Sequence, residues 1–181
     1  MAKLKAGDIE THNHYANNPP RTVVTPEMVI AQAEKYNKID EPGHLYGAII
    51  ASVRDYIKDK RLGKYAEYHL GFCAHYVADL SMPLHHTLYS AFNRKHHKKA
   101  DGIINEDVLN NLEKIEVYPI VIDSEQTLAK EIARIASLSL QLGYQLEAED
   151  RLLTKEEAYR QISHSASLLK GILQYLQEVV D

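Results

Sequence analysis

The segment AHYVADLSMPLHH, residues 74–86, carries side chains that can bind a metal ion at short, regular intervals. His75 and Asp79 are four residues apart, so they share one face of a helix. Pro83 ends that helix, and His85 follows on the exit loop. For an isolated His/Asp pair, hydrogen bonding to each other or to a neighbouring backbone group is favoured over a ligand role at roughly two to one. The addition of His85 shifts the interpretation toward a cation site.

Two further segments supply residues of the same kinds. His97 and Asp101 are again four residues apart and can bind one ion from one helix face. The front of the chain, GDIETHNHY, adds Asp8, His12 and His14. Imidazole and carboxylate ligands suit zinc, and a set without nearby thiolates is typical of a catalytic site with open coordination positions. We therefore predict a zinc site to which all three segments contribute.

The composition indicates one globular unit that is not strongly basic. With 181 residues, of which 45% are hydrophobic, the chain can bury one sizeable core, and we expect residues 1–181 to form a single domain. A net charge of -4 gives no overall attraction to nucleic acid or to an anionic membrane, although the basic run at 94–99 could contact a phosphate. Cys73, the single cysteine, is expected to be a buried thiol.

The opening segment MAKLKAGDIETHNH has no apolar stretch of the kind that a signal peptide contains. Nowhere in the sequence do about 18 uncharged apolar residues follow one another, so we expect no transmembrane segment. As written, the sequence predicts a soluble, cytoplasmic chain, and it leaves protein partners open.

Helical periodicity dominates the chain, and no segment is predicted to form a sheet. Helices are expected at about 25–37, 44–60 and 64–80, from Asp123 or Ser124 onward, and from Thr154 to Val180. Residues 9–24 and 81–96 break the periodicity and are predicted to be loops. The fold is therefore predicted to be an all-α, single-domain, multi-helix bundle.

The helix expected at 64–80 is predicted to be buried nearly all round. Its main apolar stripe includes Cys73 and Val77, yet Tyr68 and Phe72 lie nearly opposite that stripe. Much of the remaining side carries small residues that would let another helix approach closely, namely Gly71, Ala74 and Ala78. The polar pair on this helix would then lie where an unpaired charge costs a few kcal/mol or more.

The pattern His75-xxx-Asp79-xxx-Pro83-x-His85, written HYVADLSMPLH, resembles the signature helix and loop of the zinc-dependent phospholipase C and single-strand nuclease superfamily. The pattern is specific because it fixes four positions at set offsets and is followed by a second His-xxx-Asp pair. The stretch HYANNPP, residues 14–20, also looks like the histidine and the Asn/Pro-rich loop of the nuclease branch. The resemblance extends over roughly residues 8–110 and implies a helical fold of this type, shortened at the N-terminus.

The resemblance also implies a set of zinc ligands. A first zinc ion would be held by His14, His75 and Asp79, with Asp8 as a further candidate ligand. A second zinc ion would be held by His85, His97 and Asp101. Members of the superfamily hold a third zinc ion partly through an N-terminal tryptophan, but this sequence contains no tryptophan. We therefore expect two zinc ions and leave the third open, with His12 as its candidate ligand.

The implied activity is zinc-dependent hydrolysis of a phosphodiester by a metal-activated water molecule. Asp8 is the candidate catalytic residue, which would orient the water or accept its proton. The superfamily acts on phospholipids or on single-stranded nucleic acid, and the sequence does not select between these substrates. The superfamily is usually secreted, in contrast to the expectation from the opening segment. The alternative is a non-catalytic metal-binding bundle that has lost the third zinc site.

Overall fold

The computed structural model describes residues 8–180, apart from the side chain of Asp8. The described part is helical and, except for one isolated bridge between Asn18 and Thr87, contains no β-pairing. The helices are α1 (Asp8–Thr11), α2 (Pro26–Ala33), α3 (Leu45–Arg61), α4 (Glu67–Leu80), α5 (Ala91–Asp101), α6 (Glu125–Ala148) and α7 (Lys155–Val180). Three short 3-10 segments are η1 (Pro83–His85), η2 (Val108–Asn110) and η3 (Leu112–Lys114). The prediction of an all-α multi-helix bundle is confirmed.

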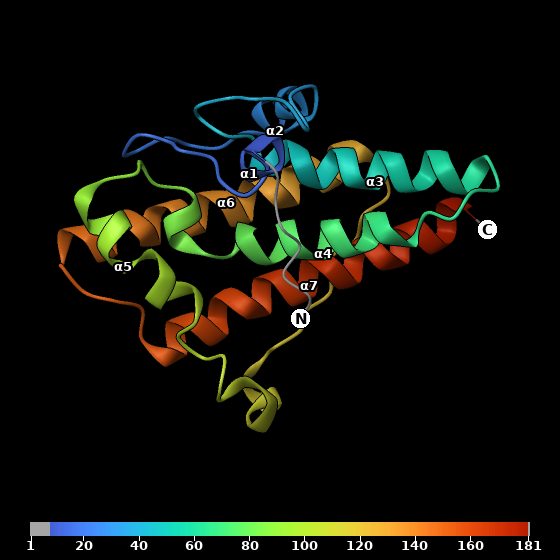
Figure 1. The fold of residues 1–181 in the computed structure, drawn as a ribbon. Helices are drawn as coiled ribbons and strands as arrows, with labels where there is room; N and C mark the ends of the chain where they lie inside the picture. The colour runs from blue at the N-terminus through green and yellow to red at the C-terminus, as the bar shows by residue number, and fades with distance from the viewer. Residues whose placement is uncertain (1–7, 181) are drawn as a thin grey trace.

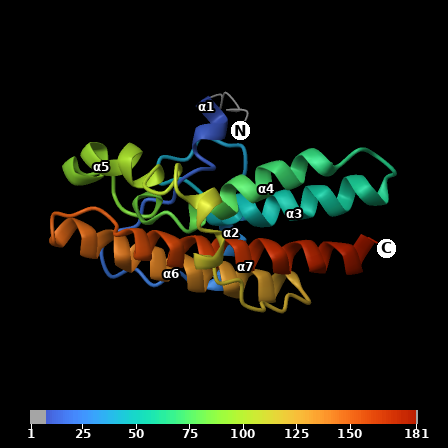
Figure 2. The same ribbon diagram turned by 90° about the horizontal axis from the view of Figure 1, so that it is seen from below.

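The four long helices lie alongside one another in two layers. Helices α3 and α4 form an antiparallel pair that packs over α6 and α7, while α2 covers one side and α5 lies beyond the end of α4 (Figures 1 and 2). One large cluster of buried apolar side chains joins α2, α3, α4, α6 and α7, and includes Val29, Ile49, Val77, Ile132 and Leu168. This core holds α4 rigidly enough for side chains at its C-terminal end to keep a defined geometry.

Capping residues fix where most helices begin. Thr25 caps α2 by accepting a hydrogen bond from the Met28 amide at 3.3 Å, and Pro26 occupies the first helical position. Ser124, one of the two predicted caps, is the N-cap of α6, which begins at Glu125. The predicted capping box of α7 is also present, because Thr154 and Glu157 exchange side-chain-to-backbone hydrogen bonds.

The predicted loop over 81–96 is too long. Ser90 accepts a hydrogen bond from the Asn93 amide at 3.2 Å, and α5 begins at Ala91. The segment that follows Phe92 is polar on all sides, so it lacks the apolar periodicity on which the prediction depended. The predicted loop over 9–24 likewise includes the end of α1, and the helix expected to reach residue 37 ends at Ala33.

The prediction that α4 is buried nearly all round is wrong. Helix α4 packs mainly against α3 and α7, with smaller contacts to α6 and η1. Its buried residues are only His69, Cys73, Tyr76, Val77 and Leu80. On its open side Gly71 and Ala78 are exposed, and a Cβ atom added to Gly71 would meet nothing within 4 Å. Cys73 on the covered side is buried as predicted, and burial raises the pKa of its thiol to about 12. Gly71 and Ala78 therefore face solvent and Ala74 is half-buried, so the small residues do not mark a close helix–helix contact.

Within residues 8–180, no helix combines the length and the hydropathy that crossing a bilayer requires.

Candidate metal centre

Backbone hydrogen bonds bring the N-terminal segment beside the loop that follows α4. The amides of Ala16 and Asn18 donate to the carbonyls of His85 and His86, each at 2.9 Å. On the other side of this segment, the His44 amide donates to the His12 carbonyl at 2.9 Å. The segment is therefore held between the start of α3 and the exit loop of α4. This arrangement places His14 next to residues that follow it by about seventy positions.

Two clusters within residues 8–180 could hold a metal ion, and the first, here called group A, consists of His14, His75 and Asp79. Asp79 Oδ2 lies 2.8 Å from His14 Nδ1 and 3.4 Å from His75 Nε2. One ligand atom from each residue lies within 4.8 Å of the others. The two imidazole rings meet edge to face with centroids 4.7 Å apart. His75 is the open member of the group, because its side chain is 52% exposed on the uncovered face of α4.

The second cluster, here called group B, consists of His85, His97 and Asp101. The two oxygens of Asp101 face the two histidines, with 3.4 Å to His85 Nε2 and 3.4 Å to His97 Nε2. His97 and Asp101 lie one turn apart on α5, while His85 ends η1. Group B thus combines one helix face with the loop, in the set that the superfamily resemblance implies.

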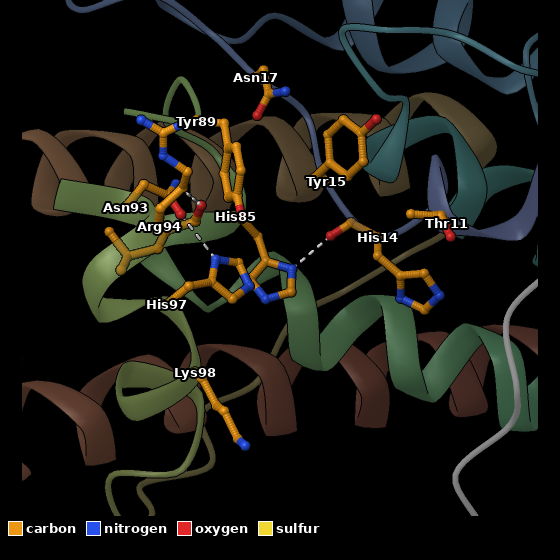
Figure 3. A pocket seen from close by; sticks show the side chains of 11 residues that line it. Thr11, His14, Tyr15, Asn17, His85, Tyr89, Asn93, Arg94, His97 and Lys98 are labelled. Carbon is orange, nitrogen blue, oxygen red and sulfur yellow. Dashed lines mark hydrogen bonds between the residues drawn. The ribbon is translucent and has the colours of Figure 1, made fainter. Parts of the chain in front are cut away.

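The remaining ring nitrogens of group B are already engaged. Nδ1 of His85 donates to the His14 carbonyl at 2.6 Å, and Nδ1 of His97 donates to Asn93 Oδ1 at 3.0 Å (Figure 3). The amide group of Asn93 is itself fixed by donation to Leu84 O at 2.7 Å and to Thr87 Oγ1 at 3.0 Å. In the neutral form of each ring these bonds place the proton on Nδ1 and the lone pair on Nε2, which is the arrangement that metal-binding histidines adopt.

Groups A and B are neighbours. Asp79 Oδ1 lies 3.8 Å from His85 Nδ1, so one carboxylate touches both groups. The hydrogen bond from His85 to the His14 carbonyl is a second link. The two ligand sets therefore form one polar centre.

Burial and neighbouring charges shift the pKa values of three histidines in this centre. Burial disfavours a charge on His85, but the carboxylates of Asp79 and Asp101 raise its pKa to about 9. Burial likewise opposes a charge on His14, and its hydrogen bonds to Asp79 and Glu10 raise its pKa above the ordinary value. His97 is shifted the other way, because burial and the nearby charge of His85 lower its pKa. The field of the centre favours a cation.

The donor set fits a divalent metal ion. Nε2 of His85 is buried and has no hydrogen-bond partner among the described residues, although it faces a carboxylate and another imidazole. An unsatisfied buried nitrogen costs about 1–3 kcal/mol, and a metal ion would satisfy it. Imidazole nitrogens and carboxylate oxygens without thiolates are ligands that suit zinc.

A pocket of about 580 Å³ opens beside both groups. It is lined by His14 of group A, by His85 and His97 of group B, and by polar and aromatic side chains that include Tyr15, Asn17, Tyr89 and Asn93 (Figure 3). Arg94 and Lys98, which belong to the basic run at residues 94–99, line the pocket near group B. A small molecule or a polymer segment in this pocket would therefore contact the metal-binding side chains directly.

Six of the seven predicted ligands are brought together, and they form the two predicted sets. The side chain of the seventh, Asp8, lies outside the described residues, so its predicted roles as ligand and catalytic residue stay predictions. His12 belongs to neither group; its Nδ1 lies 2.7 Å from the hydroxyl of Tyr15.

Two supporting residues were missed by the sequence analysis. Glu10 Oε2 lies 2.8 Å from His14 Nε2, and Asn93 holds His97 as described above. Each precedes its histidine by four residues, so the spacing that identified the ligands would also have found these partners.

Comparisons with protein-family models, curated proteins and solved structures found no match to this chain. The structure therefore defines the class only as an all-α protein with two His/Asp groups that could hold metal ions.

Proposed function

We propose that this protein is a zinc-dependent phosphodiesterase that hydrolyses a phosphoester of a phospholipid or of single-stranded nucleic acid. One observation carries the proposal. Six histidine and aspartate side chains from three separate segments gather in the two sets that the superfamily resemblance implies, and three of them, His14, His85 and His97, line one pocket. Two bound zinc ions are expected, one in group A and one in group B.

The protein's own residues would hold the metal and orient the substrate. His85 and His97 present Nε2 lone pairs whose direction is fixed by the hydrogen bonds at Nδ1. Zinc ions bound at the two groups would lower the pKa of a water molecule toward about 7 and offset the charge that builds on the phosphoryl oxygens. Asp8 is the residue that we expect to orient this water or to accept its proton.

The charge of the pocket favours an anionic substrate. Arg94 and Lys98 line it beside group B, and the guanidinium carbon of Arg94 lies 5.8 Å from the centroid of the Tyr89 ring. A cation in this position attracts the phosphate oxygens of the substrate and orients the diester toward the metal ligands. The chain's overall charge of -4 makes this attraction local.

Metal analysis combined with a panel of phosphodiesters tests the proposal. The zinc-loaded protein is expected to contain two zinc ions per chain and to cleave a nitrophenyl phosphodiester, a phospholipid or single-stranded DNA. His75→Ala should abolish most of this activity while leaving the fold intact, because the side chain is half exposed. His164→Gln, on α7 at a different pocket, is the matched control and should behave like the wild type.

Two results would contradict the proposal. Zinc binding without hydrolysis of any panel member would favour the alternative, a non-catalytic metal-binding bundle. Equal hydrolysis by the wild type and by His75→Ala would place the activity elsewhere or in a contaminant.

A further inference from the structure

Glu10 connects group A to a buried polar network that reaches the bundle core. One of its carboxylate oxygens, Oε2, lies 2.8 Å from His14 Nε2. The other, Oε1, accepts a hydrogen bond from the hydroxyl of Tyr76 at 2.8 Å. Glu10 belongs to neither metal-binding group, yet it is fixed at both of its oxygens. This geometry is that of a carboxylate that orients a metal-binding histidine.

We infer that Glu10 is a positioning residue, which holds His14 in the orientation and tautomer that a metal ion in group A requires. Nδ1 of His14 faces Asp79 at 2.8 Å, on the side where His75 also lies. A ligand atom on this side must be a deprotonated nitrogen, so the single proton of the neutral ring must reside on Nε2. Glu10 accepts a hydrogen bond at that nitrogen and stabilises this tautomer.

The network behind Glu10 limits its movement. Tyr76 is fully buried on α4, and its hydroxyl also accepts a hydrogen bond from Asn13 Nδ2 at 3.2 Å. Asn13 is held in turn by His44, whose Nε2 lies 2.8 Å from Asn13 Oδ1. Glu10 Oε1, which accepts the hydrogen bond from Tyr76, therefore has a fixed location. Through Glu10, residues of the bundle core also fix the orientation of the His14 ring.

A positioning role explains why group A needs a charged partner. His75 and His14 are both partly open to solvent, and without Glu10 the ring of His14 would keep a side-chain hydrogen bond only at Nδ1, to Asp79. In group B the Nδ1 atoms of His85 and His97 donate hydrogen bonds to neutral acceptors, the His14 carbonyl and Asn93. A carboxylate acceptor raises the basicity of the imidazole more than a neutral acceptor does, which strengthens its bond to a metal ion.

Zinc titration of paired variants tests this inference, which rests on the metal-binding part of the proposed function and not on hydrolysis. His97→Ala weakens group B, so calorimetry on that variant reports on group A; His75→Ala is the reciprocal variant. In the His97→Ala chain, adding Glu10→Ala should lower the zinc affinity about 10- to 100-fold. Glu10→Gln keeps an acceptor and should recover part of the loss. In the His75→Ala chain, Glu10→Ala should have no effect.

Further controls separate positioning from direct ligation and from a general loss of structure. Glu178→Ala, an exposed change on α7, should leave both affinities unchanged. Cobalt(II) bound at saturation should give the same absorption bands with and without Glu10→Ala, because the number of ligands does not change. Tyr76→Phe frees one oxygen of Glu10 and should cause a smaller loss than Glu10→Ala.

Four results would overturn the inference. Unchanged zinc affinity in Glu10→Ala would overturn positioning while leaving the proposed function intact. Equal losses in both chains would indicate a structural role, and altered cobalt bands would identify Glu10 as a ligand. If His97→Ala and the wild type both bind no zinc, the proposed function fails together with this inference.

Discussion

Groups A and B contain the same ligand types, two histidines and one aspartate each, but they differ in how the fold supports them. In group B, His85 is buried and both rings donate to neutral acceptors held by the loop and by α5. In group A, His75 lies open on α4, and His14 is supported by the carboxylate of Glu10. The fold therefore preorganises group B by packing and group A by charge.

This difference indicates a division of roles. The exposed His75 leaves group A open to water, whereas the buried His85 fixes one end of the centre beside the pocket. Asp79 links the groups, because its two oxygens face His14 and His85. Changes to Asp79 should therefore act on the whole centre, and changes to other ligands should act on one group.

The largest effect is expected from Asp79→Asn. Asparagine keeps the shape but removes the negative charge and one strong ligand atom from group A. Hydrolysis of a nitrophenyl phosphodiester should fall by at least about 100-fold, the upper end of what loss of a supporting residue causes. Zinc affinity should fall strongly at group A and more weakly at group B. Calorimetry and initial rates measure both quantities.

Asp101→Asn is the matched comparison, because its two oxygens face only group B. It should lower zinc affinity at group B and leave group A unchanged. If Asp79→Asn also affected one group alone, the view that Asp79 couples the two groups would be wrong.

A smaller effect is expected from Asn93→Ala, which removes the acceptor of the His97 Nδ1 proton. The zinc affinity of group B should fall about 10- to 100-fold, because the ring of His97 loses its fixed orientation. Group A, which Asn93 does not contact, should bind zinc as before. Measurement in the His75→Ala chain isolates group B. A decrease at group A of similar size would mean that the groups do not have separate supports.

The sequence predicts the local parts of this centre well because they follow from helix geometry. Each His/Asp pair is four residues apart, and both pairs lie on the helix faces expected for them. The all-α fold and most helix starts were likewise predictable from periodicity and caps. The start of α5 was missed although Ser90 is a good cap, because Asn93, Arg94 and the residues that follow show no apolar face.

The remaining features depend on tertiary contacts that spacing does not encode. A helical wheel gives the faces of α4 but not which of them another helix covers, so the exposure of His75 and Gly71 was not predicted. The approach of His14 to His85 depends on backbone hydrogen bonds between two irregular segments. The superfamily resemblance grouped these residues, whereas periodicity alone could not have paired them.

The smallest effect concerns stability, and it compares the most buried ligand with the most open one. In metal-free protein, His85→Ala should lower the free energy of unfolding by about 1–3 kcal/mol, because the His14 carbonyl loses its donor and a buried ring is removed. His75→Ala should change it by less than about 0.5 kcal/mol, since more than half of that side chain is in solvent. Urea unfolding in the presence of a chelator measures both values. Because neither measurement involves zinc or substrate, equal destabilisation by the two variants would show that the contrast between a packed and an open group is wrong, whatever the protein binds.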